Sequence, residues 1–524
     1  MTPLPLVLLV VLVTAVGLVV LARRINVPYP ILLLVGGVGL GFLPGMPSVN
    51  VAPDVVLLVL LPPLLYSAAF FAPLRQMRAN IRPIGLLAVV VVALTTVVVA
   101  VVAHFALGLS WAVAFVLGAI VSPTDPTAVE AIARRLAVPR RLVSILEGES
   151  LINDGMALTI YASAVTAAVV GSVSVAEVAG SFVLSVVGGV VIGLGLGWLI
   201  ERVRARIDSP PEELAVSMLS AYAAYLPAEL VGASGILASV TVGAYLGWRQ
   251  HEFISASTRI QTFAFWPMFV FLLNAGLFIV VGLQLPSILE GLSGRSAVEL
   301  LADAALISAV VIVVRVLWVG GATVLLRLAK RGPGGANPLP SPYAVVVAFT
   351  GMRGAVSLAA ALAIPLQTQS GAPFPERDLL IFLAFAVIAA TLIPQGLGLP
   401  RLLHRLGLDH DEAVEREEAD ARLEAARAGN RRLEELRDEP WVRQETADRL
   451  AHLYTFRENR FSARLDGHDG DGVEERSSDF QRLRRELIAA ERDTLVRLRD
   501  ENRIDSDVLR TVERDLDLED NRLA

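Results

Sequence analysis

The 524-residue sequence contains no cysteine and a single lysine, Lys330. Without cysteine, a disulfide framework, a thiolate metal site and an iron–sulfur cluster are all excluded. Charged residues are also scarce, at 18%, whereas hydrophobic residues make up 54% of the chain. This balance is typical of a polytopic membrane protein, in which apolar runs of about twenty residues cross the bilayer.

Charge is unevenly divided along the chain. Residues 401–524 hold 24 basic and 33 acidic side chains, a net charge of −9, whereas residues 1–400 hold 21 basic and 18 acidic side chains, a net charge of +3. Neither part is basic enough to indicate a nucleic-acid partner. We therefore divide the chain into a transmembrane domain at residues 1–400 and a cytoplasmic, charged helical tail at residues 401–524. The tail contains no phosphate-binding loop and no dinucleotide fingerprint.

Apolar runs bounded by charge, proline or glycine predict thirteen membrane spans and an all-α fold. The predicted limits are 4–22, 28–43, 53–71, 84–107, 111–135, 142–170, 176–201, 211–231, 233–248, 263–283, 297–328, 342–366 and 378–400. Arginine gathers in the loops after odd-numbered spans, while the loops after even-numbered spans offer only Arg295 and Arg377. Short cytoplasmic loops collect basic residues. We therefore expect a multi-pass protein of the cytoplasmic membrane with its N-terminus outside and its C-terminus in the cytoplasm.

Two of the predicted spans are interrupted. The fifth contains Ser122-Pro-Thr-Asp-Pro126, and the twelfth contains Gly351-Met-Arg-Gly354. Proline removes a helix donor and clashes with the preceding turn, and irregular backbone at membrane depth is tolerated only inside protein or beside a wet cavity. Because the two spans are seven apart, they run in opposite directions. This is the pattern of an inverted repeat whose discontinuous helices cross at a midplane binding site.

The sixth span carries the acidic segment Glu147-Gly-Glu-Ser-Leu-Ile-Asn-Asp154. A charge near the bilayer centre costs roughly 2.5 kcal/mol or more, so an intramembrane acid indicates a functional site. If the helix enters the membrane near Leu142, Asp154 lies roughly 18 Å further along it, close to the midplane. Ser150 lies one turn away on the same face, and Thr124 and Asp125 of the fifth span can add oxygen ligands from the opposite side. Such oxygens suit a hard cation.

Four motifs in order resemble those of a known family. They are Ser122–Pro126, Glu147–Asp154, Phe265-Trp266 with Asn274 and Gly282-Leu-Gln-Leu285, and Gly351-Met-Arg-Gly-Ala-Val356. Together they resemble the monovalent cation:proton antiporter family, in its first branch of sodium/proton exchangers, over almost all of residues 1–400. The resemblance implies a homodimer in the lipid bilayer, with no cofactor and no enzymatic reaction.

The resemblance also assigns roles residue by residue. Asp154 matches the acid that binds the cation and the proton alternately, and Asn153 matches the residue before it in exchangers regarded as electroneutral. Ser150 and Thr124 match ligands of the transported Na⁺, and Asp125 matches an acid of the unwound helix that orients it and balances the helix ends. Glu149 matches an acid held by a basic partner, for which Arg315 is the first choice and Arg353 the second. One position departs from the family, because Tyr66-Ser67 stands where many relatives have an acid.

The predicted function is exchange of Na⁺, with Li⁺ and K⁺ as further candidates, for H⁺ in support of pH and salt homeostasis. A K⁺/H⁺ exchanger, a cation channel of the same fold, a symporter of organic solutes and a membrane-bound signalling protein are the alternatives. At the level of residues, Asp154 could instead form a structural ion pair with Arg315. Asp125 could simply cap a half-helix, because carboxylates stabilise helix N-termini.

Overall fold

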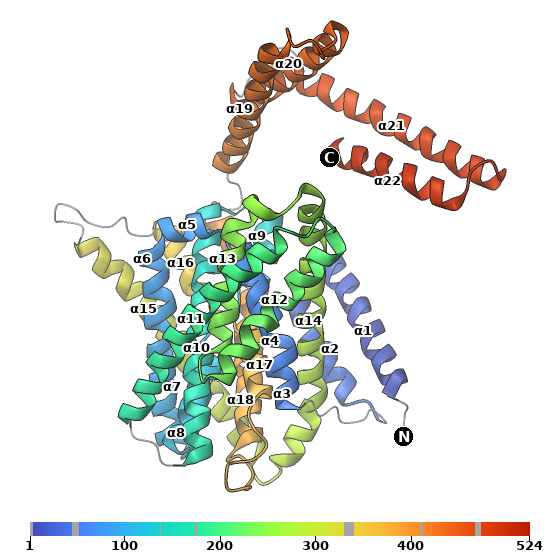
Figure 1. The fold of residues 1–524 in the computed structure, drawn as a ribbon. Helices are drawn as coiled ribbons and strands as arrows, with labels where there is room; N and C mark the ends of the chain where they lie inside the picture. The colour runs from blue at the N-terminus through green and yellow to red at the C-terminus, as the bar shows by residue number, and fades with distance from the viewer. Residues whose placement is uncertain are drawn as a thin grey trace. The chain divides into compact units, whose positions relative to one another are not determined.

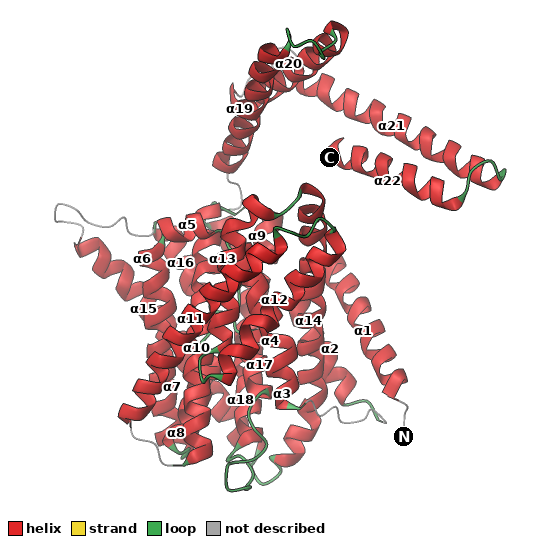
Figure 2. Cartoon of the chain, viewed as in Figure 1, coloured by secondary structure: helices red, strands yellow, loops and turns green. Residues whose placement is uncertain are grey.

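The structure is a computed structural model, and it describes residues 4–44, 52–136, 138–171, 175–329, 340–408, 412–466 and 473–523. These residues are helical with connecting loops, and no β-strand occurs among them (Figure 2). The chain forms two compact units, Met1–His410 and Asp411–Ala524. Each unit is described by itself.

The first unit contains the predicted spans. Its first half comprises α1 (Leu4–Ile25), α2 (Tyr29–Gly41), α3 (Pro53–Val55), η1 (Val56–Leu60), α4 (Leu61–Phe71), α5 (Leu74–Ala79), α6 (Ile81–Gly85), η2 (Leu86–Val90), α7 (Val91–Leu107), α8 (Trp111–Val121), α9 (Thr127–Leu136) and α10 (Arg140–Val170). Its second half comprises α11 (Val175–Arg204), α12 (Pro210–Leu230), α13 (Gly235–Phe253), α14 (Ala256–Gly291), α15 (Ala297–Ala329), α16 (Ser341–Phe349), α17 (Ala355–Leu362) and α18 (Arg377–Arg405). Each of the thirteen predicted spans corresponds to one helix, one continuous run of helix or one pair of half-helices, so the predicted fold class is confirmed.

Six helical segments within the described residues are long and apolar enough to cross a membrane. They are Pro53–Phe71, Ile81–Leu107, Gly180–Arg204, Ala256–Gly291, Ala297–Val324 and Arg377–Arg405. Two shorter apolar helices, Tyr29–Gly41 and Trp111–Val121, lie among them. An apolar helix of about twenty residues matches the hydrocarbon thickness of a bilayer. The chain is therefore a multi-pass membrane protein.

Glycine permits the closest contact between α2 and α14. A Cβ atom on Gly282 would lie 2.5 Å from the backbone carbon of Gly37, and one on Gly37 would lie 2.7 Å from the carbonyl oxygen of Ile279. Small residues let membrane helices approach to backbone contact. The glycine of the motif Gly282-Leu-Gln-Leu285 therefore has a packing role.

The fifth and twelfth spans are broken, as predicted. The first break separates α8 from α9 at residues 122–126, and the second separates α16 from α17 at residues 350–354. In Figure 1 the chain runs upward from α8 to α9 and downward from α16 to α17. The two broken helices are therefore antiparallel, as an inverted repeat requires.

The second unit consists of α19 (Glu412–Leu436), α20 (Gln444–Asp466), α21 (Val473–Asp500) and α22 (Ser506–Leu523). Helix α19 packs on α20 through buried Leu423, Ala426 and Phe461, and α21 pairs with α22 through buried Ile488 and Leu516. The unit thus has apolar contacts of its own.

Candidate cation-binding site

The two broken helices meet at their breaks. The backbone N–H of Asp125 donates to the carbonyl oxygen of Met352 at 2.8 Å, which joins the two unwound segments directly. Four half-helix ends therefore converge, because α8 and α16 arrive with their C-termini and α9 and α17 leave with their N-termini. Helix N-termini carry partial positive charge and C-termini partial negative charge. The crossing therefore needs side chains that balance the partial charges of both kinds of helix end.

One carboxylate holds both N-termini. Asp125 accepts hydrogen bonds on Oδ1 from the backbone N–H and the hydroxyl of Thr127, at the start of α9, and the N–H lies at 2.8 Å. Its Oδ2 accepts from the N–H of Ala355, at the start of α17, also at 2.8 Å. Gly354 makes this approach possible, because a Cβ there would collide with the Asp125 carboxylate. This geometry favours the interpretation of Asp125 as a cap, shared by two half-helices.

Two buried arginines bind the C-terminal ends of α8 and α16. Arg353 donates from Nε to the carbonyl oxygen of Val121, the last residue of α8, at 2.9 Å, and from Nη1 to that of Gly351. Arg315 donates from Nε to the carbonyl of Val347 at 3.0 Å and from Nη2 to that of Thr350 at 3.3 Å. Unsatisfied carbonyls at the ends of α8 and α16 thereby receive charged donors.

Glu149 forms the ion pair expected from the first choice of partner. Its Oε1 lies 2.5 Å from Nη1 of Arg315, and its Oε2 accepts from Nη2 at 3.1 Å. Both side chains are buried. A bidentate pair of this kind satisfies both carboxylate oxygens. Arg353, the second choice, is occupied with backbone carbonyls instead.

The predicted oxygen ligands form a connected cluster between α10 and the first break. Asn153 donates from Nδ2 to the hydroxyl oxygen of Thr124 at 2.7 Å, and Ser150 donates from Oγ to the Thr124 carbonyl at 2.6 Å. The Thr124 hydroxyl in turn donates to Oε1 of Glu149 at 3.4 Å. Oδ1 of Asn153 is buried and has no hydrogen-bond partner among the residues described. An unsatisfied buried acceptor of this kind calls for a water molecule or a cation.

Asp154 differs from the other two acids at the crossing. It is 8% exposed, and its carboxylate makes no hydrogen bond or ion pair with any residue that the structure describes. Its neighbours Asn153 and Ser150 belong to the cluster around Thr124. Asp154 is thus a buried carboxylate with free acceptor capacity, beside other oxygens. This is the donor set that a hard monovalent cation or a proton requires.

The position at which the family resemblance leads us to expect an acid, Tyr66-Ser67, is filled differently. Ser67 is buried and donates to the carbonyl of Leu64 at 2.9 Å within its own helix. The ring of Tyr66 lies 5.2 Å from that of Trp266. No acidic residue occurs between Asp54 and Asp125, so α4 supplies no carboxylate to the site.

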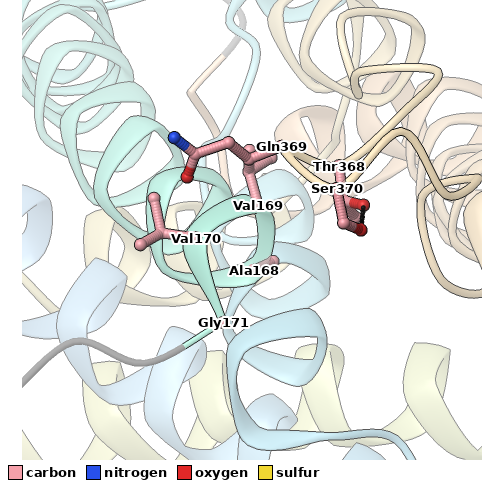
Figure 3. Close-up of a pocket in the computed structure, with 7 residues that line it drawn as sticks. All are labelled: Ala168, Val169, Val170, Gly171, Thr368, Gln369 and Ser370. Atoms are coloured by element: carbon pink, nitrogen blue, oxygen red, sulfur yellow. Dashed lines mark hydrogen bonds between the residues drawn. The ribbon is translucent and has the colours of Figure 1, made fainter.

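A surface pocket lies away from this cluster (Figure 3). It has a volume of about 420 Å³ and is lined by Ala168, Val169, Val170, Gly171, Thr368, Gln369 and Ser370. The hydroxyls of Thr368 and Ser370 lie 2.9 Å apart there. Ala168 lies fourteen residues beyond Asp154 on α10, roughly 21 Å along the helix. The pocket is therefore not the candidate cation site.

Two residues of the crossing escaped the analysis of the sequence. Gly354 was noted as part of a break and of a family motif but was given no role, although its missing side chain admits the Asp125 carboxylate. The hydroxyl oxygen of Thr391 on α18 accepts from the backbone N–H of Arg353 at 3.2 Å. Nothing in the sequence near Thr391 indicates this contact. For Gly354, the available signal in the sequence was its own identity as a glycine beside Arg353.

The fold and the crossing define a class, namely multi-pass membrane transporters whose discontinuous helices meet at a buried ion site. The chain belongs to the sodium/hydrogen exchanger family, because the family model described as "Sodium/hydrogen exchanger, transmembrane" matches residues 8–405.

Relatives agree with this assignment. A Mycobacterium tuberculosis protein named as an uncharacterized Na⁺/H⁺ exchanger is 37% identical over 99% of this chain and 96% of its own length. The Na⁺/H⁺ antiporter ApNhaP of Aphanothece halophytica is 30% identical over 94% of this chain and 92% of its own. The fold is similar to that of the sodium proton antiporter MjNhaP1 of Methanocaldococcus jannaschii at pH 8, with a TM-score of 0.61, 20% identity, and coverage of 78% of this chain and 100% of that one.

Proposed function

We propose that this protein exchanges Na⁺ for H⁺ across the cytoplasmic membrane, and that the two ions compete for Asp154. One observation carries the proposal: of the three acids at the crossing, Asp154 alone is without a protein partner among the described residues. Glu149 is paired with Arg315, and Asp125 is occupied by the starts of α9 and α17. Among the described residues, Asp154 therefore carries the one buried negative charge at the crossing that is free to take a cation or a proton.

The cation ligands follow from the same cluster. Asp154 supplies the charged oxygen, and the free Oδ1 of Asn153 is the nearest neutral acceptor in the sequence. Ser150 and Thr124 contribute hydroxyl oxygens. Each hydroxyl can donate its hydrogen elsewhere and still bind Na⁺ through a lone pair of its oxygen. Asp125 acts as a positioning residue, because its carboxylate already holds two helices. Glu149, Arg315 and Arg353 keep the half-helices in place.

Coupling requires only that the protein reorient when Asp154 holds one ion or the other. A bare carboxylate in the membrane interior is unfavourable, so the empty, charged site resists crossing. Asn153 is neutral, and Glu149 is neutralised by Arg315. The single negative charge of Asp154 therefore binds either one Na⁺ or one H⁺, and one ion replaces the other. The proposed exchange is therefore electroneutral.

Several further features are proposed on sequence grounds. The arginine-rich loops after odd-numbered spans support an N-terminus outside and a C-terminus in the cytoplasm. Family membership supports a homodimer and a role in pH and salt homeostasis. Because the chain lacks cysteine, the orientation can be tested with single cysteines. Ser110→Cys should react with an impermeant maleimide from outside, and Ser257→Cys only after permeabilisation.

The decisive test is exchange by the purified full chain in sealed liposomes. A Na⁺ gradient should drive a change of internal pH that reverses when the gradient is reversed and that an imposed membrane potential leaves unchanged. Comparison of Na⁺, Li⁺ and K⁺ then separates a Na⁺/H⁺ exchanger from a K⁺/H⁺ exchanger. A cation channel would instead give a flux that follows the potential.

Asp154→Asn should abolish this exchange, because it replaces the carboxylate for which Na⁺ and H⁺ compete with a neutral amide. Asp303→Asn on α15 serves as the matched control, since Asp303 lies twelve residues before Arg315, roughly 18 Å along the helix, and pairs with Arg295 at 3.9 Å. The proposal fails if Asp154→Asn transports as fast as the parent. It also fails if the control loses exchange to the same extent.

A further inference from the structure

Tyr161 on α10 combines a buried ring with a hydroxyl group that makes no hydrogen bond to the protein. The residue is 4% exposed, and its hydroxyl has no hydrogen-bond partner among the residues described. Buried polar groups are nearly always hydrogen-bonded, either to protein or to ordered water. A buried tyrosine follows this rule, because its hydroxyl usually finds a partner. The Tyr161 hydroxyl is therefore suited to bind water.

Tyr161 lies on the same face of α10 as Asp154. The two residues are seven positions apart on one helix, which gives a drift of only about 20° around the helix. Their separation along the helix axis is roughly 10.5 Å. Side chains on a helix lean toward its N-terminus, so the side chain of Tyr161 leans toward Asp154. Between them on this face lies Leu158, an apolar residue that is 1% exposed.

The same face of α10 leads to the surface pocket. Ala168 lies a further seven residues along the helix, roughly 10.5 Å beyond Tyr161. It lines the pocket of about 420 Å³, to which the loop after α17 contributes Gln369 and its two neighbours (Figure 3). The backbone N–H of Gln369 donates to the carbonyl of Val169 at 3.3 Å, which holds this loop to the end of α10. Asp154, Tyr161 and the pocket therefore occupy successive levels of one helix face.

A second buried hydroxyl lies on the half-helix that follows the crossing. Ser357 is 2% exposed, and its Oγ also has no hydrogen-bond partner among the residues described. It belongs to the first turn of α17, which begins at Ala355, where the backbone N–H donates to Asp125. Helix α17 contacts α10, and the chain continues from α17 into the loop that lines the pocket. Unpartnered hydroxyls therefore lie on both helices that lead from the crossing to the pocket.

We propose that the Tyr161 hydroxyl binds the water through which Na⁺ and H⁺ pass between Asp154 and the pocket at the end of α10. In the proposed orientation this pocket opens on the outer side, because α10 begins at Arg140 in a loop assigned to the cytoplasm. Tyr161 is a positioning residue, since water bridges groups too far apart for a direct hydrogen bond. Passage of the ions requires displacement of Leu158. The role in transport rests on the proposed function, whereas the hydration of Tyr161 can be measured by itself.

The first test compares Tyr161→Phe with the parent in membrane vesicles of both orientations. Right-side-out vesicles offer Na⁺ to the outer face and everted vesicles offer it to the cytoplasmic face, and Na⁺-driven proton flux gives a KM for each. Loss of one hydrogen bond should raise the KM at the outer face roughly threefold to tenfold and leave the cytoplasmic KM within about twofold of that of the parent. Tyr222→Phe is the matched control, since its hydroxyl donates to the carbonyl of Val59 at 3.1 Å, and both its KM values should match the parent. An equal rise at both faces in Tyr161→Phe, or no rise at either, would overturn the proposal.

Radiolytic labelling of the purified full chain tests the water independently of exchange. Hydroxyl radicals formed from bound water oxidise the side chains beside it, so Tyr161 should be modified several-fold more than Tyr66. Tyr66 is the buried reference, because it is 0% exposed and its hydroxyl lies 3.5 Å from Oγ of Ser217. Equal modification of the two tyrosines would overturn the proposal. If the parent exchanged no ions in either kind of vesicle, the proposed function would fail, and the labelling would still decide whether Tyr161 binds water.

Discussion

At the scale of residues, the partners of three buried carboxylates separate their roles. Glu149 has both oxygens on Arg315, and Asp125 has both oxygens on the starts of two half-helices. A buried charge is tolerated when it is paired and hydrogen-bonded. Asp154 has no such partner in the described structure, which is why we propose it as the acid that takes a cation or a proton.

The Glu149–Arg315 pair gives a prediction about stability. Glu149→Gln leaves a buried guanidinium without its counter-charge, so the free energy of unfolding should fall by about 3–5 kcal/mol. Thermal unfolding in detergent should show a markedly lower Tm. The double variant Glu149→Gln/Arg315→Gln should lose less than the single variant, because neither charge then remains alone.

Glu299→Gln is the matched control, since its partner Arg295 lies 3.9 Å away at the surface and Glu299 is 54% exposed. Exposed pairs contribute about 0–1 kcal/mol, so its Tm should stay near that of the parent. A Glu149→Gln protein as stable as the parent would contradict the structural role of the pair.

How much of this site was predictable depends on the kind of contact. Arg315 was the first choice for Glu149 from the family resemblance, which matches Glu149 to an acid held by a basic partner. The carbonyl partners of Arg353 were not predictable, because the backbone offers the same acceptor at every residue. Only the three-dimensional fold shows that the carbonyl of Val121 is one of those left open.

At the scale of elements, the two breaks form one structural unit, because hydrogen bonds join them. Pro123, Pro126 and Gly351–Gly354 predict where the helices stop, because proline and glycine disfavour helix interiors. Their meeting was expected only from the pattern of an inverted repeat. The contact itself joins Asp125 to Ala355, 230 residues apart. Local sequence patterns carry no information on such a contact.

Gly354 gives the prediction at this scale. In Gly354→Ala the added Cβ would collide with the Asp125 carboxylate, so the shared cap on α9 and α17 must shift. Misplaced groups at a functional site reduce rates by about 100-fold even for shifts near 1 Å, and we expect exchange in liposomes to fall at least about tenfold. Gly320→Ala on α15, where a Cβ would meet open space, should keep the parent rate. Exchange by Gly354→Ala within twofold of the parent would show that the close approach is unnecessary.

At the scale of the whole molecule, the chain divides between a membrane unit and an acidic helical unit. The change in charge after residue 400 indicated the tail, but α18 continues to Arg405 and the compact unit extends to His410. Hydropathy detects where an apolar run stops. It does not detect how far the same helix continues beyond the bilayer.

The division predicts the effect of truncation. A chain that ends after His410 keeps every residue of the crossing, so it should exchange Na⁺ for H⁺ in liposomes at a rate comparable with that of the full chain. We also propose that the tail is regulatory, and we therefore expect the pH profile of exchange to shift. The measurement is exchange by both proteins across pH after correct insertion is verified. Complete loss of exchange in a folded, inserted truncation would assign the tail an essential role instead.

The most direct measurement is the number of protons released when purified protein binds Na⁺. Calorimetric titration in buffers of different ionisation enthalpy gives this number, and cation binding to a ligand that must lose its proton releases that proton. At a pH where the site starts protonated, the account predicts release of about one proton per Na⁺ by the parent, and neither binding nor release by Asp154→Asn. Saturable Na⁺ binding without proton release, or unchanged release by Asp154→Asn, would contradict it.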